Sequence, residues 1–142
     1  MNPNIKAHKG YHVVWRIEHA KDYHGPYLRW FTMNQKLNKF REFVSDLHLD
    51  AAHPTPYCDG LPEVNPADFC GFFDFDSFIK WFDEGLRAAL TDHGFRLRAY
   101  LVREEDVSSV GYSGQCFFNR DGASVAADYR PDHFDEKQKE VA

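Results

Sequence analysis

Two histidines and two cysteines in and around a proline-rich stretch could bind a metal ion. They are His48, His53, Cys58 and Cys70, spaced H-x4-H-x4-C-x11-C. Imidazole nitrogens and thiolates are the donors of structural zinc sites, but such sites usually contain a closer pair of ligands. We therefore predict loop histidines and a buried Cys70 with no metal bound, and we keep a zinc-stabilised binding domain as an alternative.

Cys58 could also act as a nucleophile, because His53 and Asp59 are near it in the sequence. A catalytic cysteine needs a base within hydrogen-bond reach and a lowered thiol pKa. Nearness along the chain provides neither, so we interpret Cys58 as an ordinary loop cysteine. The chain has no G-x-G-x-x-G or Walker motif, which argues against dinucleotide binding of the doubly wound type.

Four aromatic residues around His24-Gly25-Pro26 could form a protein-binding surface. They are Tyr23, Tyr27, Trp30 and Phe31. Tyrosine and tryptophan are frequent hot-spot residues of protein interfaces. The alternative is that these side chains pack beneath their own loop as a satellite of the core, and the sequence does not decide between the two.

The pattern along the chain predicts one α+β domain over residues 1–130, with a small, mostly antiparallel sheet, two main helices and a long proline-rich loop. Alternating or continuous apolar residues predict strands at 11–18, 69–73, 95–102, 115–118 and about 124–127. Helical spacing predicts one helix from the cap Asn34 to about His48, and a second over 77–92 capped by Asp76. Residues 131–142 are charged and predict a flexible tail.

Side chains alternate between the two faces of a strand, which divides the candidate residues. In the first strand, Trp15 and Ile17 should face the core, so Arg16 should lie on the opposite face. In the strand at 95–102, Arg96 and Arg98 share a face with Tyr100. This face could contact a phosphate or a base, although the commoner outcome, and our prediction, is that such a face is solvated.

Composition limits the classes of function. The chain has 142 residues, 43% of them hydrophobic, which fits one folded domain. Its net charge of −5 argues against nonspecific nucleic-acid binding and suits a basic protein partner. Three cysteines predict no disulfide framework. Met1 to Gly10 carries no apolar signal stretch, and no apolar run is long enough for a membrane span, so we expect a cytoplasmic protein.

The order of elements and three short motifs resemble the ADP-ribosyltransferase superfamily. The motifs are VVWRIE with Arg16, CGFFD running into a helix at Ser77, and GQCFF with Gln115. The resemblance implies that Arg16 and Ser77 hold NAD and that Gln115 occupies the position of the catalytic glutamate. A neutral amide cannot stabilise a developing positive charge as a carboxylate does, so the resemblance implies a scaffold without its catalytic acid. The enzyme-like interpretation gains support if Arg16 and Gln115 face each other across a cleft.

The set VWRIEH, HGPY, HPTP, CGFFDFDSFIKWF and HGF also resembles small uncharacterised proteins of phages and other mobile elements. This resemblance implies a role in host takeover or in blocking host defence. The favoured function is therefore a small acidic phage-type accessory protein that binds and inhibits or redirects a host protein. The alternative is an active NAD-dependent ADP-ribosyltransferase.

Overall fold

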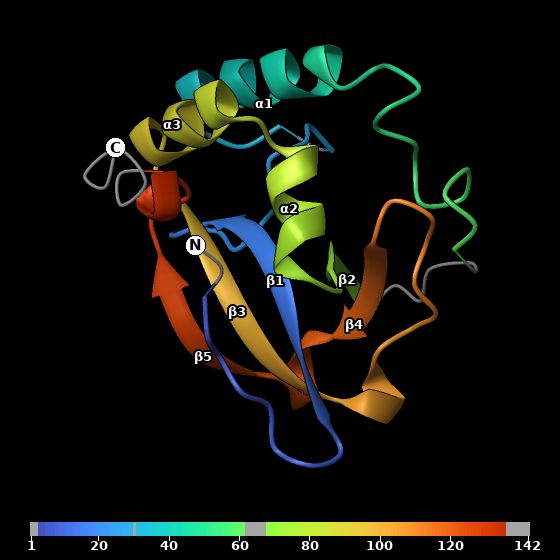
Figure 1. Ribbon diagram of the computed structural model, residues 1–142. Helices are drawn as coiled ribbons and strands as arrows, with labels where there is room; N and C mark the ends of the chain where they lie inside the picture. Colours follow the sequence, from blue (N-terminus) through green and yellow to red (C-terminus); the bar gives the residue numbers. More distant parts are fainter. Residues whose placement is uncertain (1–2, 30, 62–67, 136–142) are drawn as a thin grey trace.

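Five antiparallel strands form one sheet in the order β4-β2-β1-β3-β5 (Figure 1). The computed structural model describes residues 3–29, 31–61 and 68–135, and all statements about elements concern these residues. The strands are β1 (Tyr11–His19), β2 (Asp68–Phe72), β3 (Phe95–Arg103), β4 (Gln115–Asn119) and β5 (Ser124–Tyr129). The predicted α+β class with an antiparallel sheet is confirmed.

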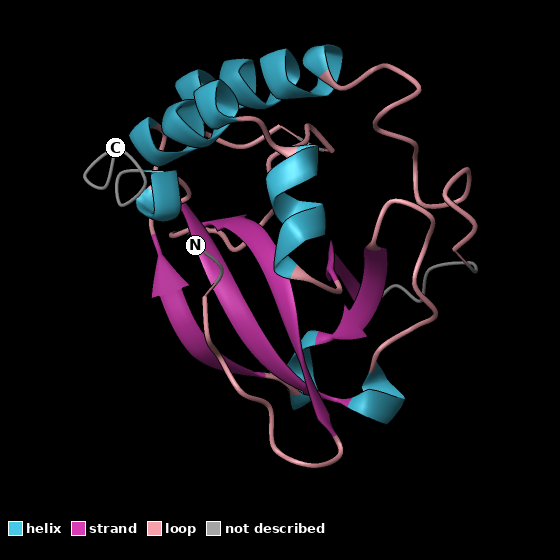
Figure 2. Ribbon diagram, viewed as in Figure 1, coloured by secondary structure: helices cyan, strands magenta, loops and turns pink. Residues whose placement is uncertain are grey.

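Three α-helices pack over one face of this sheet (Figure 2): α1 (Gln35–Leu47), α2 (Phe75–Trp81) and α3 (Glu84–Asp92). The side chain of Asn34 accepts a hydrogen bond from the Leu37 N–H, so the predicted N-cap of α1 is confirmed. No helix of the described residues is long and apolar enough to cross a membrane.

The single helix predicted over 77–92 is wrong, because the chain leaves the helical conformation at Phe82 and starts again. Asp83 caps α3 by accepting from the Leu86 N–H. Asp74, and not Asp76, caps α2. The sequence analysis missed this break because the buried residues of both helices pack into one core, so the apolar pattern continues across Phe82.

Both faces of the sheet are buried over part of their area. The helices cover odd-numbered side chains of β1 and β3, such as Trp15 and Leu97. The opposite face holds a second cluster around Val14, Tyr100 and Phe118. The prediction of a solvated face on β3 is therefore wrong for Tyr100 and Arg98, whose exposure is 2% and, for the side chain of Arg98, 12%, whereas the side chain of Arg96 is 33% exposed.

Strands β1 and β2 share a single register pair, Trp15 with Phe72, whereas β1 pairs with β3 along its whole length. Gly71 allows the close approach at this point, because a Cβ atom there would lie 2.9 Å from the carbonyl oxygen of Trp15. Beyond the pair, the Arg16 guanidinium bridges the strands by donating to the carbonyl of Cys70 at 2.7 Å. The sheet is thus split between β1 and β2.

The segment after β5 was predicted to be a flexible tail from residue 131 onward. Its described part, residues 131–135, packs on the domain. Phe134 is buried and contacts the rings of Phe75 and Tyr129. Asp135 forms an ion pair with Arg87 at 2.8 Å. Residues 136–142 lie outside the described part of the chain.

Candidate functional site

A cavity of about 680 Å³ lies at the split between β1 and β2. Its other walls come from the loop that follows β1, the end of α1, the proline-rich loop and the end of α2. The volume falls within the range of small-molecule sites. Arg16 and Gln115, the two residues that the ADP-ribosyltransferase resemblance singled out, both line this cavity.

Arginines and histidines outnumber carboxylates in the described lining of the cavity. Asp68 is the one carboxylate among its described lining residues. Six lining residues are arginines or histidines: Arg16, Arg29, Arg41, His24, His48 and His53. Arg16 and Arg41 are paired with Glu18 and Asp22 behind the lining, and the lowered pKa of His48 keeps it neutral, so the positive charge open to a ligand is smaller than this count.

Arg16 is buried, and the protein uses each of its nitrogens. The Nε atom donates to Glu18 at 2.9 Å, and the two terminal nitrogens donate to the carbonyls of Cys70 and Tyr23. Burial lowers the pKa of Arg16, and the Glu18 carboxylate partly offsets this effect. An arginine nonetheless stays charged in proteins, so Arg16 supplies a fixed positive charge at the cavity wall.

Gln115 holds the proline-rich loop against β4. Its amide nitrogen donates to the carbonyl of Pro54 and to the carboxylate of Asp59, both at 3.1 Å. Asp59 is itself 1% exposed. A glutamate in place of Gln115 would bring a second carboxylate against this buried one, and like charges there are unfavourable. An amide at position 115 is therefore more favourable next to the buried Asp59 than a carboxylate would be.

A hydrogen-bonded group of aromatic side chains forms another wall. The Tyr27 hydroxyl accepts from the Trp81 indole N–H at 2.6 Å. Its own hydrogen goes to Nδ1 of His48, also at 2.6 Å, so the ring hydrogen of neutral His48 is on Nε2. Burial and the neighbouring His53 lower the pKa of His48 to about 4. Burial raises the pKa of Tyr27.

His53 stacks on His48 with ring centroids 3.6 Å apart. Its Nδ1 faces the Asp50 carboxylate and its Nε2 faces the Trp81 carbonyl. Both partners are hydrogen-bond acceptors. Of the residues considered for zinc, Cys58 is exposed and away from the cavity lining. The described residues contain no group of three or more His, Cys, Asp or Glu that could hold a metal ion.

Acidification from pH 6.5 to pH 4 is expected to lower the free energy of unfolding by about 3 kcal/mol through His48. The pKa of this residue is lower in the folded protein, so the unfolded chain takes up the proton first as the pH falls. Well above pH 6.5, where neither state is protonated, this contribution is constant. Urea unfolding across this range should show a much flatter pH dependence for His48→Gln. Equal slopes for both proteins would contradict the assignment.

The remaining predicted site residues are scattered. Ser77 lies outside the cavity lining and packs against Gly114. Tyr27 lines the cavity, whereas the ring of Tyr23 faces arginines on the other face of the sheet. Phe31 is 77% exposed. Trp30 lies outside the described residues. The loop aromatics that the structure describes therefore do not form one surface.

The sequence analysis missed Arg41, which shapes the loop above the cavity. Its guanidinium donates to both carboxylate oxygens of Asp22 and to the carbonyl of Gly25. Arg41 is 2% exposed. The sequence did contain an indication that Arg41 is buried: its helical spacing places it on the same face of α1 as Leu37 and Val44.

Comparison with protein families identifies a match over most of the chain. A family model described as "Bacteriophage T4 Y00F protein" matches residues 1–132. No curated protein and no solved structure matches the chain. The comparisons therefore give no support to the ADP-ribosyltransferase resemblance, whereas the match to a phage family covers nearly the whole chain.

Proposed function

We propose that this chain, which belongs to the bacteriophage T4 Y00F protein family, binds a protein of the host cell and inhibits or redirects it. The family confirms the prediction of a small phage protein and makes the chain a phage accessory protein. The proposal adds a host protein as the partner, the host cytoplasm as the place of action, and host takeover or anti-defence as the purpose.

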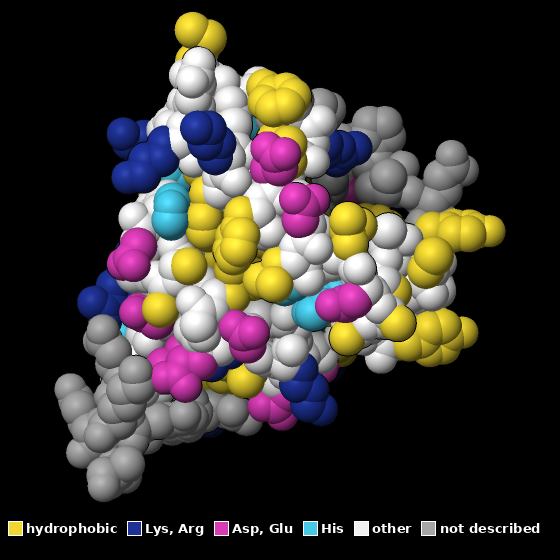
Figure 3. All heavy atoms as spheres, turned by 90° about the horizontal axis from the view of Figure 1, so that it is seen from above, with side chains coloured by type: hydrophobic (Ala, Val, Ile, Leu, Met, Phe, Trp, Pro, Cys, Tyr) yellow, Lys and Arg dark blue, Asp and Glu magenta, His cyan; other side chains and the backbone are white. Residues whose placement is uncertain are grey.

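The observation that supports this proposal is a group of exposed hydrophobic side chains on and around α1, which we call the α1 apolar surface. Phe43 and Leu47 lie one helical turn apart and are 54% and 46% exposed. Phe31, Met33 and Leu49, which flank the helix in the sequence, are also exposed. Figure 3, which views the molecule from above, shows hydrophobic side chains gathered among charged ones. Exposed apolar patches mark interaction sites.

The charges of the protein agree with such a partner. The net charge of −5 favours encounter with a basic protein surface and disfavours a nucleic-acid backbone. Charged residues of both signs, such as Lys39 and Glu42, share α1 with the apolar side chains. An apolar centre with a polar rim is the usual anatomy of a protein interface.

Capture of a host protein should fail when the α1 apolar surface is made polar. Phe43→Ser combined with Leu47→Ser is expected to weaken binding of the captured protein by about 100-fold or more, because central apolar contacts dominate interface energies. Affinity purification from host lysate, followed by mass spectrometry and titration with the purified partner, measures this. The thermal midpoint should change little, since both side chains are about half exposed.

Val125→Ser is the matched control, because Val125 is also about half exposed but lies on β5. It should capture the same partner with unchanged affinity. The proposal fails if the wild type captures no host protein. It also fails if the α1 double variant binds as tightly as the control.

A second candidate function is NAD binding in the cavity at the strand split. The specific observation in its favour is that Arg16 and Gln115, far apart in the sequence, line the same cavity. Calorimetry with NAD tests it directly, and the absence of heat at millimolar NAD would reject it. This result is independent of host-protein capture, because Phe43 and Leu47 lie outside the cavity lining.

A further inference from the structure

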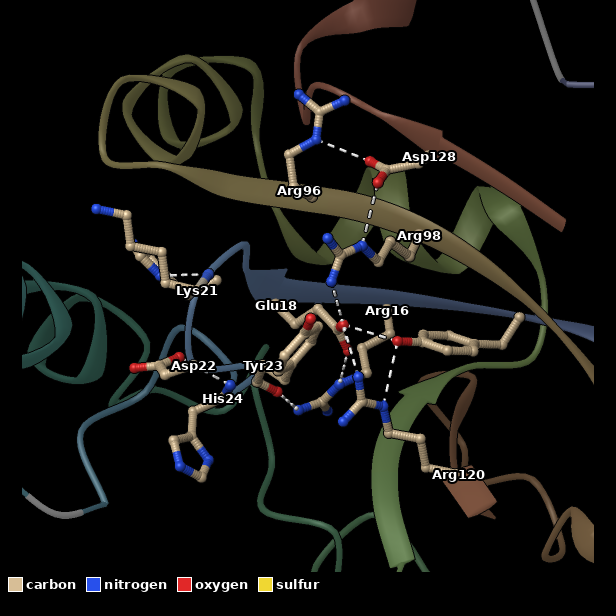
Figure 4. Close-up of polar contacts among 12 residues, drawn as sticks. Arg16, Glu18, Lys21, Asp22, Tyr23, His24, Arg96, Arg98, Arg120 and Asp128 are labelled. Atoms are coloured by element: carbon tan, nitrogen blue, oxygen red, sulfur yellow. Dashed lines mark hydrogen bonds and ion pairs between the residues drawn. The ribbon is translucent and has the colours of Figure 1, made fainter. Parts of the chain in front are cut away.

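Four arginines and two carboxylates form a cluster on the sheet face opposite the helices (Figure 4). At its centre is Glu18, which is fully buried. Its carboxylate accepts from Arg16 at 2.9 Å, from Arg98 at 2.6 Å and from the Tyr100 hydroxyl at 2.7 Å. Arg120 approaches the same carboxylate at 3.6 Å.

The cluster carries more positive than negative charge. Asp128 is the second carboxylate, and it accepts from Arg96 at 2.7 Å and from Arg98 at 3.2 Å. Four guanidinium groups thus face two carboxylates, which leaves an excess of two positive charges within the cluster. The excess is notable in a chain whose net charge is −5.

The outer members of the cluster are open to solvent. The side chains of Arg96 and Arg120 are 33% and 27% exposed, whereas Arg98 and Glu18 form a buried base. Arg120 uses Nε for the Tyr100 hydroxyl. Its terminal nitrogens have one acidic neighbour in the described part of the chain, Glu18. Terminal N–H groups of Arg120 therefore lie beside the buried ion pair of Glu18 and Arg98.

Tyr23 places an aromatic ring over these arginines. The guanidinium carbons of Arg120 and Arg98 lie 4.4 and 5.4 Å from the ring centroid. The backbone of Tyr23 has a φ of 63°, a conformation that side-chain-bearing residues rarely adopt. Hydrogen bonds fix it there, because its N–H donates to the His19 carbonyl and its carbonyl accepts from Arg16. Such conformations concentrate at functional sites.

We propose that this arginine cluster binds a phosphate monoester. The excess of two positive charges matches the charge of about −2 that a monoester carries at neutral pH. A guanidinium group can bind two phosphate oxygens through parallel N–H donors, which suits the terminal N–H groups of Arg120. The half-exposed ring of Tyr23 offers an apolar contact for the organic part of the ligand. A nucleic-acid backbone fits less well, because the acidic chain repels a long polyanion.

Titration with inorganic phosphate, glycerol phosphate, adenosine 5′-monophosphate and adenosine tests the proposal and distinguishes the sources of the phosphate. The wild type should bind the phosphate-bearing probes and not adenosine. Arg120→Gln should weaken binding about tenfold or more, whereas Arg103→Gln, an exposed arginine at the end of β3, should not. Asp128→Asn should strengthen binding several-fold, because it raises the excess of positive charge.

The last variant separates binding from a structural role, since loss of an ion pair alone would not tighten a ligand. Circular dichroism and thermal midpoints would confirm that each variant is folded. The proposal is overturned if the wild type binds none of the phosphates at millimolar concentration or binds single-stranded DNA more tightly than the monoesters. It is also overturned if folded Arg120→Gln binds them as the wild type does. Host-protein capture is measured separately and does not depend on these results.

Discussion

Glu18→Gln is expected to lower the free energy of unfolding by about 3–5 kcal/mol. Glu18 is fully buried and neutralises Arg16 and Arg98 through hydrogen bonds of 2.9 and 2.6 Å. A glutamine can accept some of these bonds, but it leaves the buried Arg16 guanidinium without a countercharge and leaves Arg98 with only the partly exposed Asp128. Because the free energy of unfolding of small domains is only about 5–15 kcal/mol, this decrease should be readily measured by urea unfolding followed by circular dichroism.

Asp128→Asn is the matched control for this prediction. It removes a carboxylate from the same arginine cluster, but the side chain of Asp128 is 39% exposed. Exposed ion pairs contribute about 0–1 kcal/mol, so the control should be nearly as stable as the wild type. Equal losses for the two variants would mean that burial of Glu18 does not set its contribution.

Asp135→Ala is the second change with a large expected effect, also about 3–5 kcal/mol. Asp135 accepts two hydrogen bonds from Arg87, at 2.8 and 2.9 Å, and both residues are buried. Removing the carboxylate leaves the Arg87 charge in the interior, held by backbone carbonyls of Ile79 and Phe82. Chemical unfolding measures the loss and tests whether the segment after β5 belongs to the folded unit.

The double variant Arg87→Met with Asp135→Ala is the control. It removes both charges, so it should be more stable than Asp135→Ala alone, because an unpaired buried charge is the main source of the loss. A double-mutant cycle gives the coupling between the two side chains. A loss below about 1 kcal/mol for Asp135→Ala would show that the ion pair does not hold this segment.

The sequence by itself determined the local structure and the family. Strand positions, the α1 cap at Asn34 and the α+β class follow from alternation, helical spacing and capping, which involve residues within a few positions of each other. The resemblance to small phage proteins rests on short motifs, and the family match over residues 1–132 confirms it. The helix break at Phe82 was missed, because the local stripe continues across it.

Only the tertiary structure decided which charged and polar residues meet. Arg16 reaches Cys70 across 54 positions, Gln115 reaches Asp59 across 56, and Glu18 reaches Arg98 across 80. Such pairings depend on strand order and register, which the packing of the whole sheet sets. Strand β3 illustrates the difference. The sequence predicted that its apolar and polar side chains alternate, but the burial of the polar side chains depends on Glu18 of β1 and Asp128 of β5, the two strands that pair with β3. The cavity exists for the same reason, because β1 and β2 meet at one register pair and then separate.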